Sequence, residues 1–200
     1  FTPFATRRIC DQIAISICYA KQNVKIIGSD PGITAELNGG THMSVEDIGV
    51  LRSIPGILIF EPVDAVQLAQ ALPQIVEYPG PVYIRLFRKE TPQIFDPETY
   101  RFQLTSADVL SEGEDVTLLA SGIMVEESLK AAALLAEEGF HAEVVNVHTI
   151  KPLDAETILR SVKKTGAVVT CENHNVVGGL ASSAAELLCR MAPVPLECIG

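Results

Sequence analysis

Short apolar runs alternate with segments of helical periodicity along most of this chain, and this alternation limits the folds open to it. In the first half, the runs at 24–28, 57–60 and 82–86 predict buried strands. Strands of this kind, separated by helices, are typical of a parallel sheet covered on both faces. The predicted helices span residues 7–20, a segment that starts at Ser44, and 64–77, where Asp64 is suitably placed as the N-cap.

Residues 89–114 break this alternation, and we interpret them as a connector with a short edge strand. A second α/β layer structure follows. Its predicted strands are 115–120, 142–147, 167–171 and 194–199, and its predicted helices are 125–138, 154–164 and a last helix ending near 191. The sequence therefore predicts an α/β protein of two domains, at residues 1–88 and 115–200.

A glycine-broken loop places His42 just before a predicted helix start. Ser44 fits an N-cap, and Asp47 three residues later is close to a capping box. Gly39 and Gly40 allow a ligand to approach the backbone, and a helix N-terminus favours electron-rich groups. His42 is therefore a candidate site residue; the alternative is an exposed histidine hydrogen-bonded to water.

Further side chains are candidates, each with a structural alternative. Phe1, Phe4 and Arg7 recur at three-residue steps, as core aromatics with a surface arginine or as a stacking pocket for a flat heterocycle. Arg85 and Arg88 follow a predicted parallel strand, where ligands of open α/β sheets collect. They are candidates for holding a phosphate or carboxylate, or they form a solvated basic patch.

The remaining polar motifs predict structure rather than chemistry. Residues 172–175 read as a strand-end loop, and His174 lacks the companion ligands of a metal site. His141 and His148 flank a predicted strand and are expected to be structural. The sequence contains no nucleophile elbow, phosphate loop or complete dinucleotide fingerprint.

Composition narrows the function classes. A net charge of −10 with only short basic runs argues against a nucleic-acid partner, and no apolar run is long enough to cross a membrane. Five cysteines without paired spacing predict free thiols and a cytoplasmic location. Because the chain opens on Phe1 in ordered-looking sequence, we interpret it as a piece of a longer polypeptide.

Several motifs, taken in order, resemble the transketolase family of thiamine-diphosphate enzymes, specifically the C-terminal section of split, two-subunit transketolases. FTPFATRRICDQI is similar to a Phe-x-x-Phe-Ala-Thr-x-Arg-x-x-Asp-Gln-Ile pattern, and GGTHMSVEDIGVLRSIPGILIFEPVDA looks like the Gly-x-Thr-His-Gln helix and the motifs after it. VYIRLFRK, ASGIMVEESLKAAALLAEEG, VNVHTIKPLD and ENHNVVGGL follow in the family's order. The likeness covers nearly the whole chain.

The resemblance implies roles for both halves. Residues 1–88 would be the later part of the pyrimidine-binding domain, and 115–200 the transketolase C-terminal domain, both three-layer α/β/α structures. The implied cofactor-binding residues, around the aminopyrimidine ring, are Phe1, Phe4 and Arg7. His42 would be catalytic, contacting the donor near its carbonyl. The implied substrate-binding residues are Asn38, His42, Arg85 and Arg88, with Arg88 at the sugar phosphate.

The implied reaction is transfer of a two-carbon ketol unit from a ketose to an aldose through thiamine diphosphate. The activating glutamate would lie upstream of Phe1, and the domain that binds diphosphate and Mg²⁺ would belong to a separate N-terminal subunit. A second copy of this chain would complete a dimer or larger oligomer. Small sugars are the implied substrates, and this chain alone is expected to be inactive. Glu172 and His174, in a chiefly structural domain, are poor candidates for catalysts.

Three positions depart from the family pattern and leave the substrate open. Asn38 stands where an aspartate is frequent, Met43 where glutamine is usual, and Asp30 where many members have histidine. A non-phosphorylated or differently charged ketose is one hypothesis, and loss of activity is another. The alternatives at the family level are a 2-oxo acid dehydrogenase β-subunit, a deoxyxylulose-phosphate synthase, and a catalytically silent assembly partner.

Overall fold

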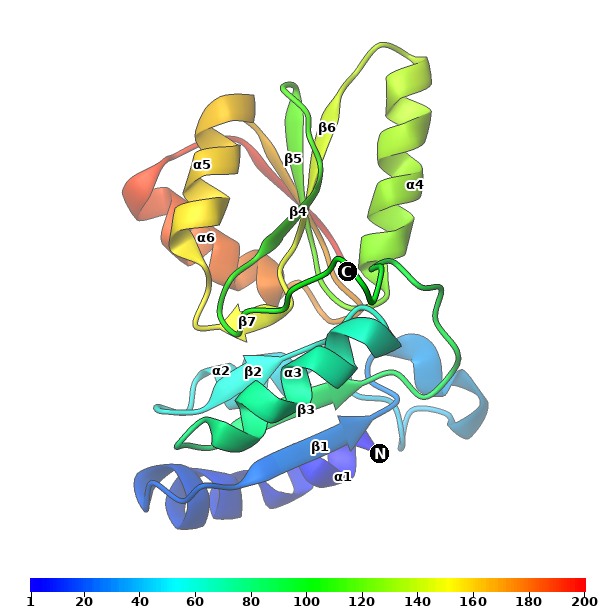
Figure 1. The fold of residues 1–200 in the computed structure, drawn as a ribbon. Coiled ribbons are helices and arrows are strands. Elements are labelled where there is room, and N and C mark those ends of the chain that lie inside the picture. Colours follow the sequence, from blue (N-terminus) through cyan, green and yellow to red (C-terminus); the bar gives the residue numbers. More distant parts are fainter.

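The computed structural model describes residues 1–200 and contains two α/β units, each built on its own sheet (Figure 1). The first sheet has the strand order β1-β3-β2-β7, and the second has the order β4-β6-β5-β8-β9. Helices pack on both faces of each sheet. The predicted fold class, α/β with two three-layer domains, is therefore confirmed.

The first unit is built on three parallel strands. β1 (Lys25–Ser29) and β2 (Leu58–Phe60) both pair with the central β3 (Val82–Leu86). One face carries α1 (Thr2–Ala5), a 3₁₀ turn (Arg7–Ile9), a π-helix (Gln12–Tyr19) and α2 (Asp47–Arg52), and the other face carries α3 (Ala65–Glu77). The helix predicted at 7–20 thus exists as two pieces of unlike winding.

Apolar side chains on alternating strand positions form the two cores of this unit. On one face, Ile13, Ile48 and Leu51 pack with Ile59 and Tyr83. The opposite core contains Phe60, Ala71, Ile75, Val82 and Ile84. The alternation follows from the two-residue period of a strand, which sends successive side chains to opposite faces.

The second unit repeats the arrangement with five strands. β6 (Ala142–Asn146), β5 (Val116–Ala120), β8 (Val168–Cys171) and β9 (Leu196–Ile199) run parallel, and β4 (Asp108–Ser111) adds an antiparallel edge. α4 (Met124–Glu137) covers one face, and α5 (Ala155–Thr165) and α6 (Leu180–Met191) cover the other. The edge strand expected in the connector is β4.

Helix starts agree with the sequence at two places and differ at a third. Asp64 accepts a hydrogen bond from the Gln67 backbone N–H at 2.7 Å, and Asp154 accepts one from Thr157 at 3.0 Å. The predicted N-cap at Ser44 is wrong, because α2 begins only at Asp47. The Ser44 carbonyl accepts from the Gly32 N–H at 2.7 Å, which keeps this residue in an extended pairing.

One strand crosses between the units and was not predicted. β7 (Thr149–Lys151) follows β6 of the second sheet but pairs antiparallel with β2 of the first. The Lys151 ammonium donates to the carbonyls of Arg52 and Ile54 at 2.8 and 2.5 Å. β7 is only three residues long and lies close behind β6, so no pattern in the sequence distinguishes a new strand here from a continuation of β6.

His148 lies at this crossing and is fully buried. Its ring packs against Phe60 and Phe102, with centroids 5.7 and 4.8 Å away, and its Nε2 is 3.8 Å from the Asp108 carboxylate. Burial lowers the pKa of His148 to about 4, so the ring is neutral near pH 7. The expectation that His148 is structural is confirmed. None of the helices combines the length and the apolar character needed to span a membrane.

The buried imidazole predicts a stability that falls in acid. The unfolded chain binds a proton at His148 near its ordinary pKa of 6.5, while the folded protein binds it only near pH 4. The stabilisation is therefore complete above pH 6.5 and is lost as the pH falls toward 4, by about 2 kcal/mol between about pH 7.5 and about pH 5. Urea unfolding of the native protein and His148→Gln at both pH values measures this loss.

Burial raises the pKa of Asp108 to about 6, so this carboxyl titrates in the same pH range and changes the stability in the opposite direction. Because both proteins contain Asp108, the difference between their stabilities reports the contribution of His148. His141→Gln is the matched control, because that histidine is exposed. An equal pH dependence in native protein and His148→Gln would refute the assignment.

Candidate functional site

Three aromatic rings from two separate segments meet at one end of the first sheet. Phe1 lies just before α1 and Phe4 lies on it, with ring centroids 6.1 Å apart, and the His42 ring meets both edge-on, at 4.9 and 5.1 Å. All three are half-buried. The family resemblance implies that Phe1 and Phe4 bind the cofactor ring and that His42 contacts the donor sugar, and the structure brings these three side chains together.

The loop before α2 sets the position of His42. The His42 N–H donates to the Gly39 carbonyl at 3.0 Å, and Gly39 has a left-handed φ of +72° that favours glycine. The His42 Nδ1 is 2.9 Å from the Thr41 hydroxyl, which leaves the other ring nitrogen for a ligand. A tight, glycine-dependent turn thus brings the imidazole onto the two phenyl rings.

Two arginines flank the rings, and one of them was not among the predicted site residues. The Arg8 guanidinium lies 4.1 Å from the centre of the Phe4 ring, and that of Arg88 lies 5.4 Å from the centre of Phe1. Arg7 instead pairs with Glu46 at 2.6 Å, outside the ring cluster. The backbone breaks at Thr6, so the three-residue step from Phe4 does not continue to Arg7. The sequence did contain a signal for Arg8, because this residue occupies the arginine position of the family motif.

Arg85 corrects a second prediction. Its side chain is fully buried, and its Nε and Nη1 lie 2.8 and 2.5 Å from Asp47 and Glu61. A third donor reaches the Asn173 carbonyl at 2.8 Å. The proposed substrate-binding role of Arg85 is wrong, because these partners occupy a guanidinium that has no open surface.

The two remaining predicted substrate residues are Asn38, in the loop that leads to His42, and Arg88, beside the Phe1 ring. Asn38 ends a 3₁₀ segment (Ile33–Asn38) and is exposed. The Arg88 Nε is 2.8 Å from the Asp30 carboxylate. Asp30 is 1% exposed and has a left-handed φ of +54°, unusual for a residue with a side chain. The roles of Asn38 and Arg88 stay predictions.

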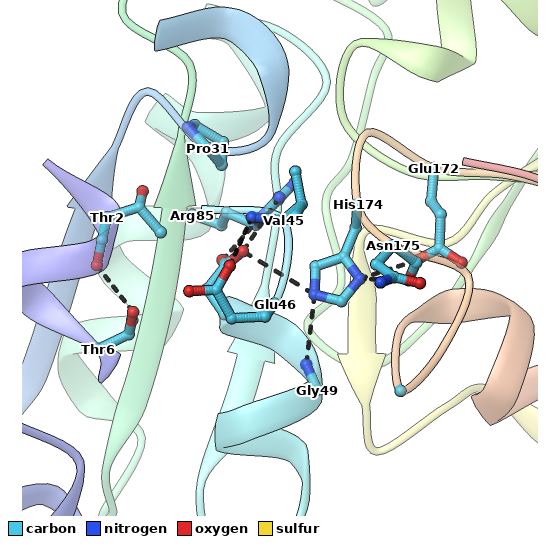
Figure 2. Close-up of polar contacts among 12 residues, drawn as sticks. Thr2, Thr6, Pro31, Val45, Glu46, Gly49, Arg85, Glu172, His174 and Asn175 are labelled. Carbon is cyan, nitrogen blue, oxygen red and sulfur yellow. Dashed lines mark hydrogen bonds and ion pairs between the residues drawn. The ribbon is translucent and has the colours of Figure 1, made fainter. Parts of the chain in front are cut away.

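A loop of the second unit holds the loop that carries these residues. Asn173 accepts from the Ile33 N–H at 3.1 Å and donates to the Pro31 carbonyl at 3.0 Å. The Asn175 N–H donates to the Val45 carbonyl at 2.8 Å. Figure 2 shows the neighbouring His174 ring between Gly49 of α2 and the Asn175 backbone. Sequence reasoning gave this loop no contact with the first unit.

Glu172 serves the helix of its own unit. Its two oxygens accept from the N–H groups of Leu180 and Ala181 at 2.7 and 2.8 Å, at the start of α6. Burial raises the pKa of Glu172 to about 7, against the effect of these hydrogen bonds. Burial also lowers the pKa of His174. Both side chains are enclosed by the protein.

The ring cluster fits the pyrimidine end of a thiamine cofactor. Two half-buried phenyl faces, an imidazole and a guanidinium are suitable neighbours for a flat heterocycle with polar edges. No group of three His, Cys, Asp or Glu side chains in the chain is arranged to hold a metal ion.

Comparison with protein families assigns both units. Residues 1–93 match the transketolase pyrimidine-binding domain, and residues 105–197 match the transketolase C-terminal domain. The chain therefore belongs to the transketolase family, whose members depend on thiamine diphosphate.

Within the family, the chain is similar to subunits of split transketolases. It is 59% identical over its full length to the 6-deoxy-6-sulfo-D-fructose transketolase subunit SqwH of Clostridium sp. (strain MSTE9), and covers 62% of that protein. It is 36% identical over 98% of its length to an apulose-4-phosphate transketolase subunit from Phocaeicola vulgatus, and covers 63% of it. The chain thus spans under two thirds of the curated relatives it matches.

A solved structure shows the same arrangement of both units. The structure titled "Split gene transketolase, inactive beta4 tetramer" superposes with a TM-score of 0.93 at 42% identity, over the whole of this chain and 64% of that one. The expected resemblance to split transketolases is confirmed.

The contacts of Asn173 predict that removing its side chain loosens the segment at residues 31–38 of the first unit. Asn173→Ala leaves the Ile33 N–H without a partner and removes one donor to the Pro31 carbonyl, which keeps the Thr34 hydroxyl, so we expect the free energy of unfolding to fall by about 2 kcal/mol. Hydrogen–deuterium exchange of residues 31–38 should accelerate. Asn175→Ala is the control, because its side chain accepts only from Val177 in its own loop. Unchanged exchange at 31–38 in Asn173→Ala would contradict the bracing role.

Proposed function

We propose that this chain is part of the C-terminal subunit of a transketolase, which transfers a two-carbon ketol unit from a ketose to an aldose. The observation that supports the proposal most directly is the contact of His42 with both Phe1 and Phe4. These rings come from segments about forty residues apart, and they meet where parallel strands end, the usual place for a ligand in such sheets.

Each residue of the site then has a role set by its chemistry. Phe1 and Phe4 hold the pyrimidine ring of thiamine diphosphate by apolar contact, and Arg8 fixes the orientation of Phe4. His42 donates a hydrogen bond to the donor sugar at the oxygen where negative charge develops. Asn38 and Arg88 contact the remainder of the sugar. The bound cofactor supplies the carbanion chemistry that no side chain provides.

The proposal requires other chains. Because the ring cluster has no neighbouring metal site, a partner subunit would bind the diphosphate with Mg²⁺. A second copy of this chain would complete the oligomer. Five free cysteines fit a reducing cytoplasm. The relatives named above act, by their names, on a sulfonated and a phosphorylated ketose, so the names alone leave the donor open.

The full-length subunit mixed with its partner subunit, thiamine diphosphate and Mg²⁺ should transfer ketol units, and either subunit alone should not. We expect His42→Ala to lower kcat/KM by about 100-fold, because it removes a donor to the developing charge. Phe4→Ala should weaken cofactor binding by about tenfold, measured by titration of the assembled apoenzyme.

Phe140→Ala is the matched control for Phe4→Ala, because that ring is 54% exposed after α4. It should leave both quantities unchanged. An assembled enzyme that binds the cofactor but transfers nothing from any ketose would overturn the proposal and favour a silent assembly partner. Turnover by this subunit alone would overturn the assignment of the diphosphate site to a partner.

A further inference from the structure

We propose that the distal end of the donor site selects a ketose whose last carbon carries at most one negative charge, and that Asp30 is the residue that discriminates against phosphate. This inference rests on the proposed function, because it concerns the far end of the same site. It follows from how Asp30 is held and from how the cations near it are paired.

Asp30 is fixed at the end of the sheet and cannot turn away. Its N–H donates to the Leu86 carbonyl of β3 at 3.0 Å, and the next residue is held by Asn173 of the second unit. The side chain is 1% exposed, and neither carboxylate oxygen has a hydrogen-bond partner. The only compensation for its charge is the Arg88 guanidinium 2.8 Å away. A buried acid in this state favours a neighbouring cation or hydroxyl donor and opposes an anion.

The neighbouring cations are paired as well. Arg88 is matched by Asp30, Arg7 by Glu46 at 2.6 Å, and Lys89 by Glu36 at 2.6 Å. Arg8 has no acidic partner, but its guanidinium lies on the Phe4 ring. Of these four basic residues, Arg8 alone therefore has a positive charge without an acidic partner, and the others offer little net charge to a multiply charged ligand.

A sugar phosphate meets a specific difficulty here. A phosphate monoester carries between about 1.5 and 2 negative charges near neutral pH. If the Arg88 side chain turned toward the phosphate, the buried Asp30 carboxylate would lose the cation it is paired with. If Arg88 stayed beside Asp30, the phosphate would approach an ion pair with no net charge, close to a fixed acid. A terminal sulfonate carries one negative charge and a terminal hydroxyl carries none, so either group loses less than a phosphate does from the neutralisation of Arg88 by Asp30.

The test compares three donors that share one carbon skeleton in the assembled two-subunit enzyme: fructose 6-phosphate, 6-deoxy-6-sulfofructose and fructose. We expect kcat/KM for the sulfonate or the neutral sugar to exceed that for the phosphate by about tenfold or more. Asp30→Asn should raise kcat/KM for the phosphate by about tenfold and change the neutral sugar by much less. Asparagine tolerates the left-handed backbone of this position, so the loop should keep its shape.

A binding measurement separates this effect from chemistry. Glucitol 6-phosphate lacks a carbonyl and cannot react, so calorimetry reports its affinity alone. Its affinity should rise about tenfold in Asp30→Asn. Glu77→Gln changes the net charge equally at the end of α3, where that glutamate has no ion pair, and should change neither quantity. A native enzyme that prefers fructose 6-phosphate over both other donors, or an Asp30→Asn enzyme without a gain toward phosphate, would overturn the inference. Absence of transfer from every donor would instead contradict the proposed function.

Discussion

Both the fold and the site depend on the ion pairs and hydrogen bonds of the buried Arg85 guanidinium. It extends from the central strand of the first sheet and is enclosed by Asp47 at the start of α2, by Glu61 after β2, and by the Asn173 carbonyl of the second unit. A buried cation must be fully paired, and removing one partner of such a group costs about 3–5 kcal/mol. One side chain therefore specifies where α2 begins and how the two units meet.

The acids around Arg85 make further contacts that tighten this junction. Asp47 also accepts from the Tyr83 hydroxyl at 2.8 Å, and the second oxygen of Glu61 accepts from Ser121 of the second unit at 2.8 Å. Gly122 allows this approach, because a Cβ there would lie 2.5 Å from the Glu61 carboxylate. The units therefore share one polar network rather than a simple apolar seam, and such a network fixes a single relative position.

This junction gives the second unit a part in the site although it adds no residue to the ring cluster. The loop at 172–175 holds the segments that follow Asp30 and His42: the Asn173 side chain bonds to the backbone of Pro31 and Ile33, and the Asn175 N–H donates to the Val45 carbonyl. A binding loop needs a rigid support of this kind, because side chains on an unsupported loop are positioned less precisely than side chains on a helix or strand. The loop of the second unit thus determines how firmly the acid beside Arg88 is held.

The sequence by itself determined the two α/β units, most strand positions, the caps at Asp64 and Asp154, and the grouping of Phe1, Phe4 and His42. These features depend on local periodicity, local capping and motif order, which a single chain displays. The tertiary structure decided the features that depend on contacts between residues far apart in the chain, which local signals do not contain. It buried Arg85 rather than leaving it at a strand end, started α2 three residues after Ser44, placed β7 in the other sheet, and put Arg8 rather than Arg7 on the rings. Each depends on partners far away in the chain, and burial and ion pairing with such partners outweigh a local preference.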